Sequence, residues 1–133
     1  MAALDTNVLV RLLMQDEPAQ LRYAQRLIRN SASAGELLFV PVTVALELEW
    51  VLRSRFELDK AAVLQTFSQL LSTVELRFEA TAALEWALKQ YKATTADFSD
   101  CLHAALAGQA GEAPLWTFDK AAAKVGGAQL LTA

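Results

Sequence analysis

Asp5 occupies a position in the sequence where a solvated surface carboxylate would gain little. It ends a short apolar segment predicted to be a strand, and it opens the polar trio Asp5-Thr6-Asn7 before apolar residues resume at Val8. Polar groups gathered at the carboxyl end of a strand are typical of a binding or catalytic site in α/β proteins.

Glu47 is a second acid that needs a specific explanation. It lies beside the apolar stripe formed by Leu48, Val51 and Leu52 in a segment with helical periodicity. A carboxylate next to a buried stripe requires a polar partner, whereas the nearby Glu49 is predicted to be solvated.

Carboxylates that share a site repel one another unless a cation is bound. Two unit charges 4 Å apart repel by about 4 kcal/mol at an effective dielectric constant of 20. Oxygen ligands without histidine or cysteine favour magnesium or manganese. The reaction that such a centre supports best is hydrolysis of a phosphodiester, with water activated at the metal.

The remaining candidate acids each have an ordinary structural explanation. Asp59, Asp97 and Asp119 stand where helix N-caps are expected, and Asp100 would be an acid in the first turn of a helix. Spacing alone therefore leaves both a capping role and a site role open for these residues.

The elements that must position these acids alternate between strands and helices. The patterns predict strands over 2–4, 37–40, 74–78 and 115–118, and 129–132 is compatible with a last edge strand. Helices are expected over 8–14, from Pro18 to about 30, from Thr43 to 56, from Asp59 to 72, over 80–92, from Asp97 to about 108, and briefly after Asp119. This alternation predicts an α/β fold with a parallel sheet covered on both faces.

Length and composition indicate one folded domain. The 133 residues are 54% hydrophobic and 20% charged, which excludes a disordered chain. Asp5 and Arg11 interrupt the apolar opening, so no signal peptide is predicted, and no segment is long enough to cross a membrane. A single cysteine and the lack of a zinc pattern suit a reducing cytoplasm.

The net charge of −3 argues against a broad basic surface that holds nucleic acid by charge alone. Local arginines would have to assist. Arg11, Arg53 and Arg55 either contact phosphates or lie on solvated helix faces, and the sequence leaves both interpretations open.

Other residues whose side chains could take part in binding or catalysis are not assigned such roles. Trp50, Trp86 and Trp116 lie within apolar segments, so packing in the core is favoured over stacking on bases. Cys101 is expected in the core. His103 shares a helix face with Asp100, but no catalytic role is assigned to it.

Four stretches of the sequence carry a family resemblance. They are Leu4-Asp5-Thr6-Asn7-Val8, Glu47-Leu48-Glu49-Trp50-Val51-Leu52, Asp97-Phe98-Ser99-Asp100 and Thr117-Phe118-Asp119-Lys120. In their order and spacing the chain resembles the PIN-domain nucleases, and within them the VapC toxins of type II toxin–antitoxin pairs. The resemblance implies a single PIN-like three-layer domain over residues 1–133, with a central parallel sheet of four or five strands flanked by helices.

The resemblance also implies roles for individual residues. Asp5, Glu47, Asp100 and Asp119 become the quartet that binds metal and catalyses hydrolysis. Asp97 becomes a nearby acid. Asn7 and Thr117 become polar residues that support the site by orienting a ligand or a water.

The implied activity is cleavage of RNA with Mg²⁺ or Mn²⁺ by a cytoplasmic toxin. Its expected partners are an antitoxin and a second copy of the chain, and the apolar surplus is compatible with a homodimer face and a groove for an antitoxin helix. Two alternatives remain. One is an idle PIN scaffold that only binds partners. The other is a phosphatase of the haloacid dehalogenase type, which is disfavoured because Asn7 stands where that mechanism requires a second aspartate.

Overall fold

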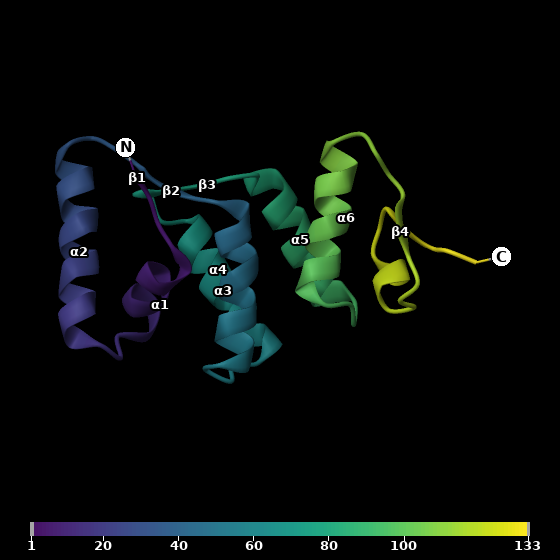
Figure 1. Cartoon of the computed structure of the whole chain (residues 1–133), viewed down its shortest axis with the longest axis horizontal. Coiled ribbons are helices and arrows are strands. Elements are labelled where there is room, and N and C mark those ends of the chain that lie inside the picture. Colours follow the sequence, from purple (N-terminus) through teal and green to yellow (C-terminus); the bar gives the residue numbers. More distant parts are fainter. Residues whose placement is uncertain (1, 133) are drawn as a thin grey trace. The chain divides into compact units, whose positions relative to one another are not determined.

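The computed structural model describes residues 2–132 of the chain. The chain divides into two compact units, residues 1–79 and residues 80–133, which are described here one at a time (Figure 1). That the whole chain forms a single domain stays a prediction.

The first unit is built on a parallel sheet of three short strands in the order β1-β2-β3. The strands are β1 (Ala2–Ala3), β2 (Leu38–Val40) and β3 (Leu76–Phe78). The helices α1 (Thr6–Met14) and α2 (Pro18–Ser33) connect β1 to β2. The helices α3 (Val42–Ser54) and α4 (Lys60–Leu71) connect β2 to β3. Because each connection crosses over through two helices, successive strands run in the same direction.

The core of the first unit is formed by aliphatic and aromatic side chains from the strands and helices. Its completely buried residues include Leu9, Val10, Leu38, Val40, Leu48, Leu52, Val63 and Phe67. The central strand β2 contributes two of these residues, Leu38 and Val40, as expected for a strand with neighbours on both sides.

Helix starts in this unit follow the capping rules. The N-cap Asp59 accepts a hydrogen bond from the backbone N–H of Ala62 at 2.8 Å, which confirms its predicted role. Pro18 occupies the first position of α2, where the missing N–H costs nothing. Helix α1 begins at Thr6, two residues earlier than predicted, because Asp5 is its N-cap.

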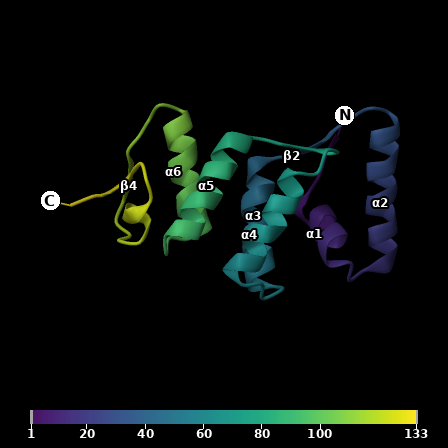
Figure 2. The same cartoon turned by 180° about the vertical axis from the view of Figure 1, so that it is seen from behind.

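The second unit pairs two helices with a small sheet. The helices α5 (Thr81–Ala93) and α6 (Phe98–Gln109) pack side by side, as both views show (Figures 1 and 2). The rings of Tyr91 and Phe98 meet edge to face with their centroids 5.6 Å apart. The strands β4 (Leu115–Thr117) and β5 (Ala128–Leu130) run parallel and are joined through the 3₁₀ helix η1 (Ala122–Lys124).

The α/β fold class with parallel strands is confirmed, but the expected sheet of four or five strands is not observed as one sheet. The five strands lie near their predicted positions, and within residues 2–132 they form a three-stranded sheet and a two-stranded sheet. Hydrophobic period locates a strand without saying which strand it pairs with, since pairing depends on hydrogen bonds between distant segments. None of the helices within 2–132 is both long and apolar enough to cross a membrane.

Candidate functional site

Asp5 directly follows the end of β1, as the sequence predicted. The pairing of β1 with β2 continues through Leu4, whose N–H donates to the carbonyl of Phe39 at 2.8 Å. The Asp5 side chain is exposed, and its Oδ1 accepts a hydrogen bond from the backbone N–H of Thr6 at 2.6 Å. Asp5 therefore caps α1 while its second carboxylate oxygen stays available at the surface.

Glu47 lies on α3, and Thr6 supplies its polar partner. The hydroxyl of Thr6 donates a hydrogen bond to Glu47 Oε1, and Thr6 is only 2% exposed. The N–H and O–H of this one buried residue therefore hold Asp5 and Glu47 together in the first unit.

The prediction for Glu49 is wrong. Glu49 is 3% exposed and forms an ion pair with Arg53 at 2.9 Å, whereas Glu47 is the exposed glutamate. The buried residues of α3 are Ala45, Leu48, Glu49 and Leu52. This i, i+3, i+4, i+7 spacing places residue 49 on the inner face, one residue away from the stripe that the sequence suggested.

The second unit holds Asp97 and Asp100 at the start of α6. Asp97 occupies the N-cap position, as the sequence predicted, but its side chain makes no capping hydrogen bond. Asp100 lies in the first turn, where its N–H donates to the carbonyl of Asp97 at 3.1 Å. A capping hydrogen bond therefore does not account for the Asp97 carboxylate.

Asp119 follows β4 and is held by the turn that leads to η1. Its Oδ1 accepts hydrogen bonds from the N–H groups of Ala121 at 2.8 Å and Ala122 at 3.3 Å. Its own N–H donates to the hydroxyl of Thr117 at 3.0 Å. Thr117 thus fixes the backbone that presents the carboxylate, and its supporting role at a site stays a prediction.

Asp100 lies in the electrostatic field of the other acids of its unit. Burial raises the pKa of the Asp100 carboxyl, and the negative charges of Asp97 and Asp119 raise it further, while His103 acts in the opposite direction. The charges of Asp97 and Asp119 are therefore close enough to Asp100 to disfavour its ionised form.

The donor set suits a hard divalent cation. Every candidate ligand is a carboxylate oxygen, and a bound cation would relieve the repulsion at Asp100. As placed, residues 2–132 contain no group of three His, Cys, Asp or Glu side chains gathered tightly enough to hold a metal ion. The ligand quartet therefore stays a prediction.

The aromatic residues assigned to the core are largely outside it. Trp50 is 59% exposed, Trp116 is 54% exposed and Trp86 is 36% exposed, so the packing prediction is wrong for them. Trp50 lies off the buried stripe of α3, and Trp116 lies on a sheet of two strands. Cys101 is completely buried, as predicted.

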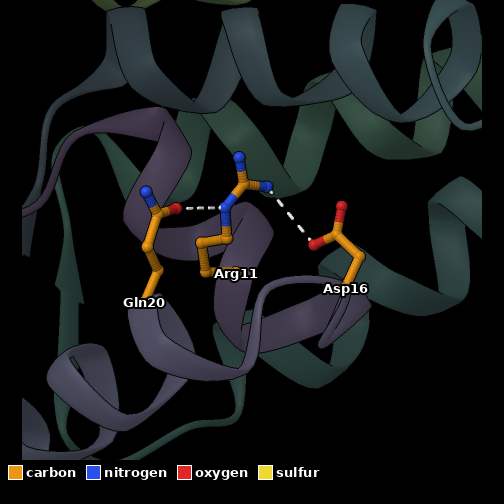
Figure 3. A network of polar contacts seen from close by, with 3 residues as sticks. All are labelled: Arg11, Asp16 and Gln20. Atoms are coloured by element: carbon orange, nitrogen blue, oxygen red, sulfur yellow. Dashed lines mark hydrogen bonds and ion pairs between the residues drawn. The ribbon is translucent and has the colours of Figure 1, made fainter.

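The three arginines considered for phosphate contact are engaged with their own chain. Arg11 donates from Nε to Gln20 Oε1 at 2.5 Å and pairs with Asp16 at 3.3 Å, which ties α1 to the start of α2 (Figure 3). Arg53 pairs with Glu49, and the guanidinium of Arg55 lies 5.9 Å from the ring centre of Phe56. Arg53 and Arg55 are nevertheless exposed, in keeping with a solvated helix face, and phosphate contact stays a prediction.

Sequence reasoning missed a different set of arginines, on α2. Arg22, Arg26 and Arg29 are all exposed, and their i, i+4, i+7 spacing was the signal that could have found them.

Comparison with known proteins defines the class of this fold and site. The family model for the PIN domain matches residues 2–128, so the chain belongs to the PIN-domain family. More particularly, it is similar to a protein named VapC ribonuclease from Aquifex aeolicus (strain VF5), with 25% identity over 126 residues that cover 95% of this chain and 93% of that protein. The resemblance stated from the four sequence stretches is thereby confirmed.

Proposed function

We propose that this protein is a metal-dependent endoribonuclease whose centre is formed by Asp5, Glu47, Asp100 and Asp119. Membership of the PIN-domain family and the similarity to a protein named VapC ribonuclease support this proposal. The observation that carries it is the pair of hydrogen bonds by which the buried Thr6 holds the carboxylates of Asp5 and Glu47. In the second unit, burial and the charges of Asp97 and Asp119 raise the pKa of Asp100, which is in keeping with a functional site.

The chain's own residues would hold and orient the ions. Mg²⁺ or Mn²⁺ would lower the pKa of a water molecule, so that the water could give up a proton and attack the phosphodiester. Thr6 sets the positions of Asp5 and Glu47 through its two hydrogen bonds. The turn at Thr117 fixes Asp119 in the same way, and Asn7 and Asp97 are the further polar groups that support the site.

We further propose the biological setting that the resemblance implies. The protein acts in the cytoplasm as the toxin of a toxin–antitoxin pair, as one domain that forms homodimers, and a cognate antitoxin silences it. The side chains of Trp50, Trp116 and Phe118 are exposed, and large apolar side chains at the surface are compatible with faces that bind other proteins.

The decisive experiment measures RNA cleavage by the purified chain, freed of any bound protein. We expect cleavage of structured RNA with Mg²⁺ or Mn²⁺, its loss with EDTA, and its loss in Asp5→Asn, which keeps the capping oxygen but removes the charge. The matched control is Asp59→Asn, which makes the same chemical change at a helix cap outside the site. Cleavage that survives both EDTA and Asp5→Asn would refute the metal mechanism.

The toxin role is tested by expressing the same variants in a bacterial host. The unaltered chain and Asp59→Asn are expected to arrest growth, and Asp5→Asn is expected to allow it. If Asp5→Asn is as toxic as the unaltered chain, toxicity does not arise from the proposed centre.

A further inference from the structure

Helix α2 carries a stripe of positive charge in an otherwise acidic protein. Arg22, Arg26 and Arg29 are exposed and lie on one face of the helix, and α2 contains no acidic residue. Within the part of the chain that the structure describes, these three arginines form no ion pair. The whole chain has a net charge of −3, so this stripe is a local reversal of sign that suits a polyanion.

A pocket of about 330 Å³ opens beside this stripe, between α1 and α2. Tyr23, which is 67% exposed, and Leu27, which is 37% exposed, form its rim on α2. Val8 and Ala24 add apolar walls. The volume is at the lower end of the range of about 300–1,000 Å³ found for small-molecule sites.

Two amide side chains, those of Asn7 and Gln20, line the same pocket and could hydrogen-bond the edge of a planar ring. Gln20 lines the pocket from α2, and its Oε1 accepts from Arg11, so its amide is held in a fixed orientation. Asn7 lines the pocket from α1 and lies only two residues after Asp5. The pocket therefore begins next to one of the proposed metal ligands.

We propose that α2 and this pocket form the binding surface for single-stranded RNA. Arg22, Arg26 and Arg29 contact successive phosphates, and an unpaired base stacks on Tyr23 with its edge toward Asn7. This inference rests on the proposed ribonuclease function, and it adds the path of the strand and the requirement for an unpaired base. Charge on one helix face combined with an aromatic platform is the chemistry by which single strands are held.

The test measures binding rather than cleavage, so that it does not depend on the metal centre. Fluorescence anisotropy of a labelled 12-nucleotide oligouridine is recorded in EDTA over a range of salt concentrations. For the combined variant Arg22→Gln, Arg26→Gln and Arg29→Gln we expect at least tenfold weaker binding. The slope of log K against log salt should fall by about 2, since each phosphate contact on a single strand contributes about 0.7.

The matched control removes three exposed lysines from the second unit: Lys89→Gln, Lys92→Gln and Lys124→Gln. This control changes the net charge by the same amount, and we expect it to keep the slope of the unaltered protein. If the arginine variant keeps that slope as well, or if both variants lose it equally, α2 does not track the strand and the proposal fails.

The base pocket is tested with Tyr23→Ala and Tyr23→Phe. Loss of a stacked base weakens binding by about 1–3 kcal/mol, or roughly 5- to 150-fold, so Tyr23→Ala should lose that much affinity and Tyr23→Phe should retain the affinity. Equal affinity of Tyr23→Ala and the unaltered protein for the single strand would refute the pocket assignment. A perfectly paired duplex should not distinguish Tyr23→Ala from the unaltered protein, because its bases cannot enter the pocket.

Competition decides between RNA and an acidic protein as the occupant. Polyglutamate at equal charge concentration is expected to displace the oligouridine poorly, since it offers no base to Tyr23. Displacement as efficient as by unlabelled RNA would overturn the proposal in favour of an acidic polypeptide. If binding follows these expectations while no RNA is cleaved with any metal, the proposed catalytic function fails and the RNA surface stands.

Discussion

The ionised form of Asp100 is disfavoured in the folded protein. Burial and the charges of Asp97 and Asp119 raise its pKa, so the folded state holds the proton more tightly than the unfolded chain does. The stabilisation that comes with the protonated carboxyl is fully present below the unfolded pKa and is lost as the pH rises through the folded pKa.

The substitution Asp100→Asn is therefore expected to stabilise the metal-free protein at neutral pH. The neutral amide avoids the repulsion from Asp97 and Asp119, so the variant should melt at a higher temperature than the unaltered protein in EDTA at pH 7. The gain should shrink as the pH falls through the raised pKa of Asp100, and it should vanish below about 4, the usual pKa of an aspartate. Thermal unfolding followed by circular dichroism at several pH values measures it.

A matched control is Glu85→Gln, which removes an exposed carboxylate from α5 in the same unit. It is expected to change the melting temperature little at any pH. A destabilised Asp100→Asn protein at pH 7 would show that the carboxylate makes favourable contacts that outweigh the repulsion.

At the scale of single residues, the sequence was a better guide to which acids are unusual than to which acids are buried. Asp5 was recognised because its charge interrupts an apolar segment, and its place after β1 is confirmed. Glu47 has the polar partner that was predicted for it, but Glu49, which was predicted to be solvated, is buried. A shift of one residue rotates a helix by about 100°, which is enough to carry a side chain from the surface to the core.

At the scale of elements, the connection between α1 and α2 depends on Arg11. Its side chain is 13% exposed and reaches across the connecting turn to Gln20 and Asp16 (Figure 3). Gln15, which ends α1, adopts a left-handed conformation with φ 53°, so the chain turns sharply here and the arginine spans the turn.

We expect Arg11→Met to loosen this helix pair while it preserves most of the packing of the side chain. Loss of the two contacts should lower the free energy of unfolding by about 0.5–2 kcal/mol, the usual range for a hydrogen bond together with a partly exposed ion pair. Urea denaturation measures the change. The control Arg22→Met removes an exposed arginine from α2 and should change stability by less than about 0.5 kcal/mol. Equal effects of the two variants would show that the link is not stabilising.

Element boundaries were predictable where local chemistry determines them. Pro18 and Asp59 begin helices in the structure as their residue types predicted. The assignment of β4 and β5 to a sheet separate from β1, β2 and β3 within the described residues was not predictable, since neither length nor hydrophobic period encodes a strand's partner.

At the scale of the whole molecule, the proposed homodimer has a direct test. Multi-angle light scattering at micromolar concentration is expected to give twice the mass of one chain, because exposed apolar side chains such as Trp50 and Phe118 favour association. The dimer should persist at high salt, since apolar contacts are not screened. A single-chain mass under these conditions would contradict the dimer.

The complete proposed ligand set could not be predicted from spacing alone. Asp5 and Glu47 were singled out by their apolar surroundings, whereas Asp100 and Asp119 also have local structural roles in a first helical turn and in a tight turn. Only the ordered resemblance to PIN-domain nucleases grouped them. An acid that has a local structural role looks the same in a single sequence whether or not it also binds a metal.

The buried residue Thr6 fixes the positions of Asp5 and Glu47 through hydrogen bonds. Both are exposed at the surface, yet both are hydrogen-bonded to a residue that is 2% exposed and is held by the packed interior. Their conformational freedom is therefore already restricted before any cation arrives, so binding would have little entropy left to remove. Substitutions in the interior around Thr6, remote from every ligand oxygen, should then alter affinity for the ion as much as changes at the surface do.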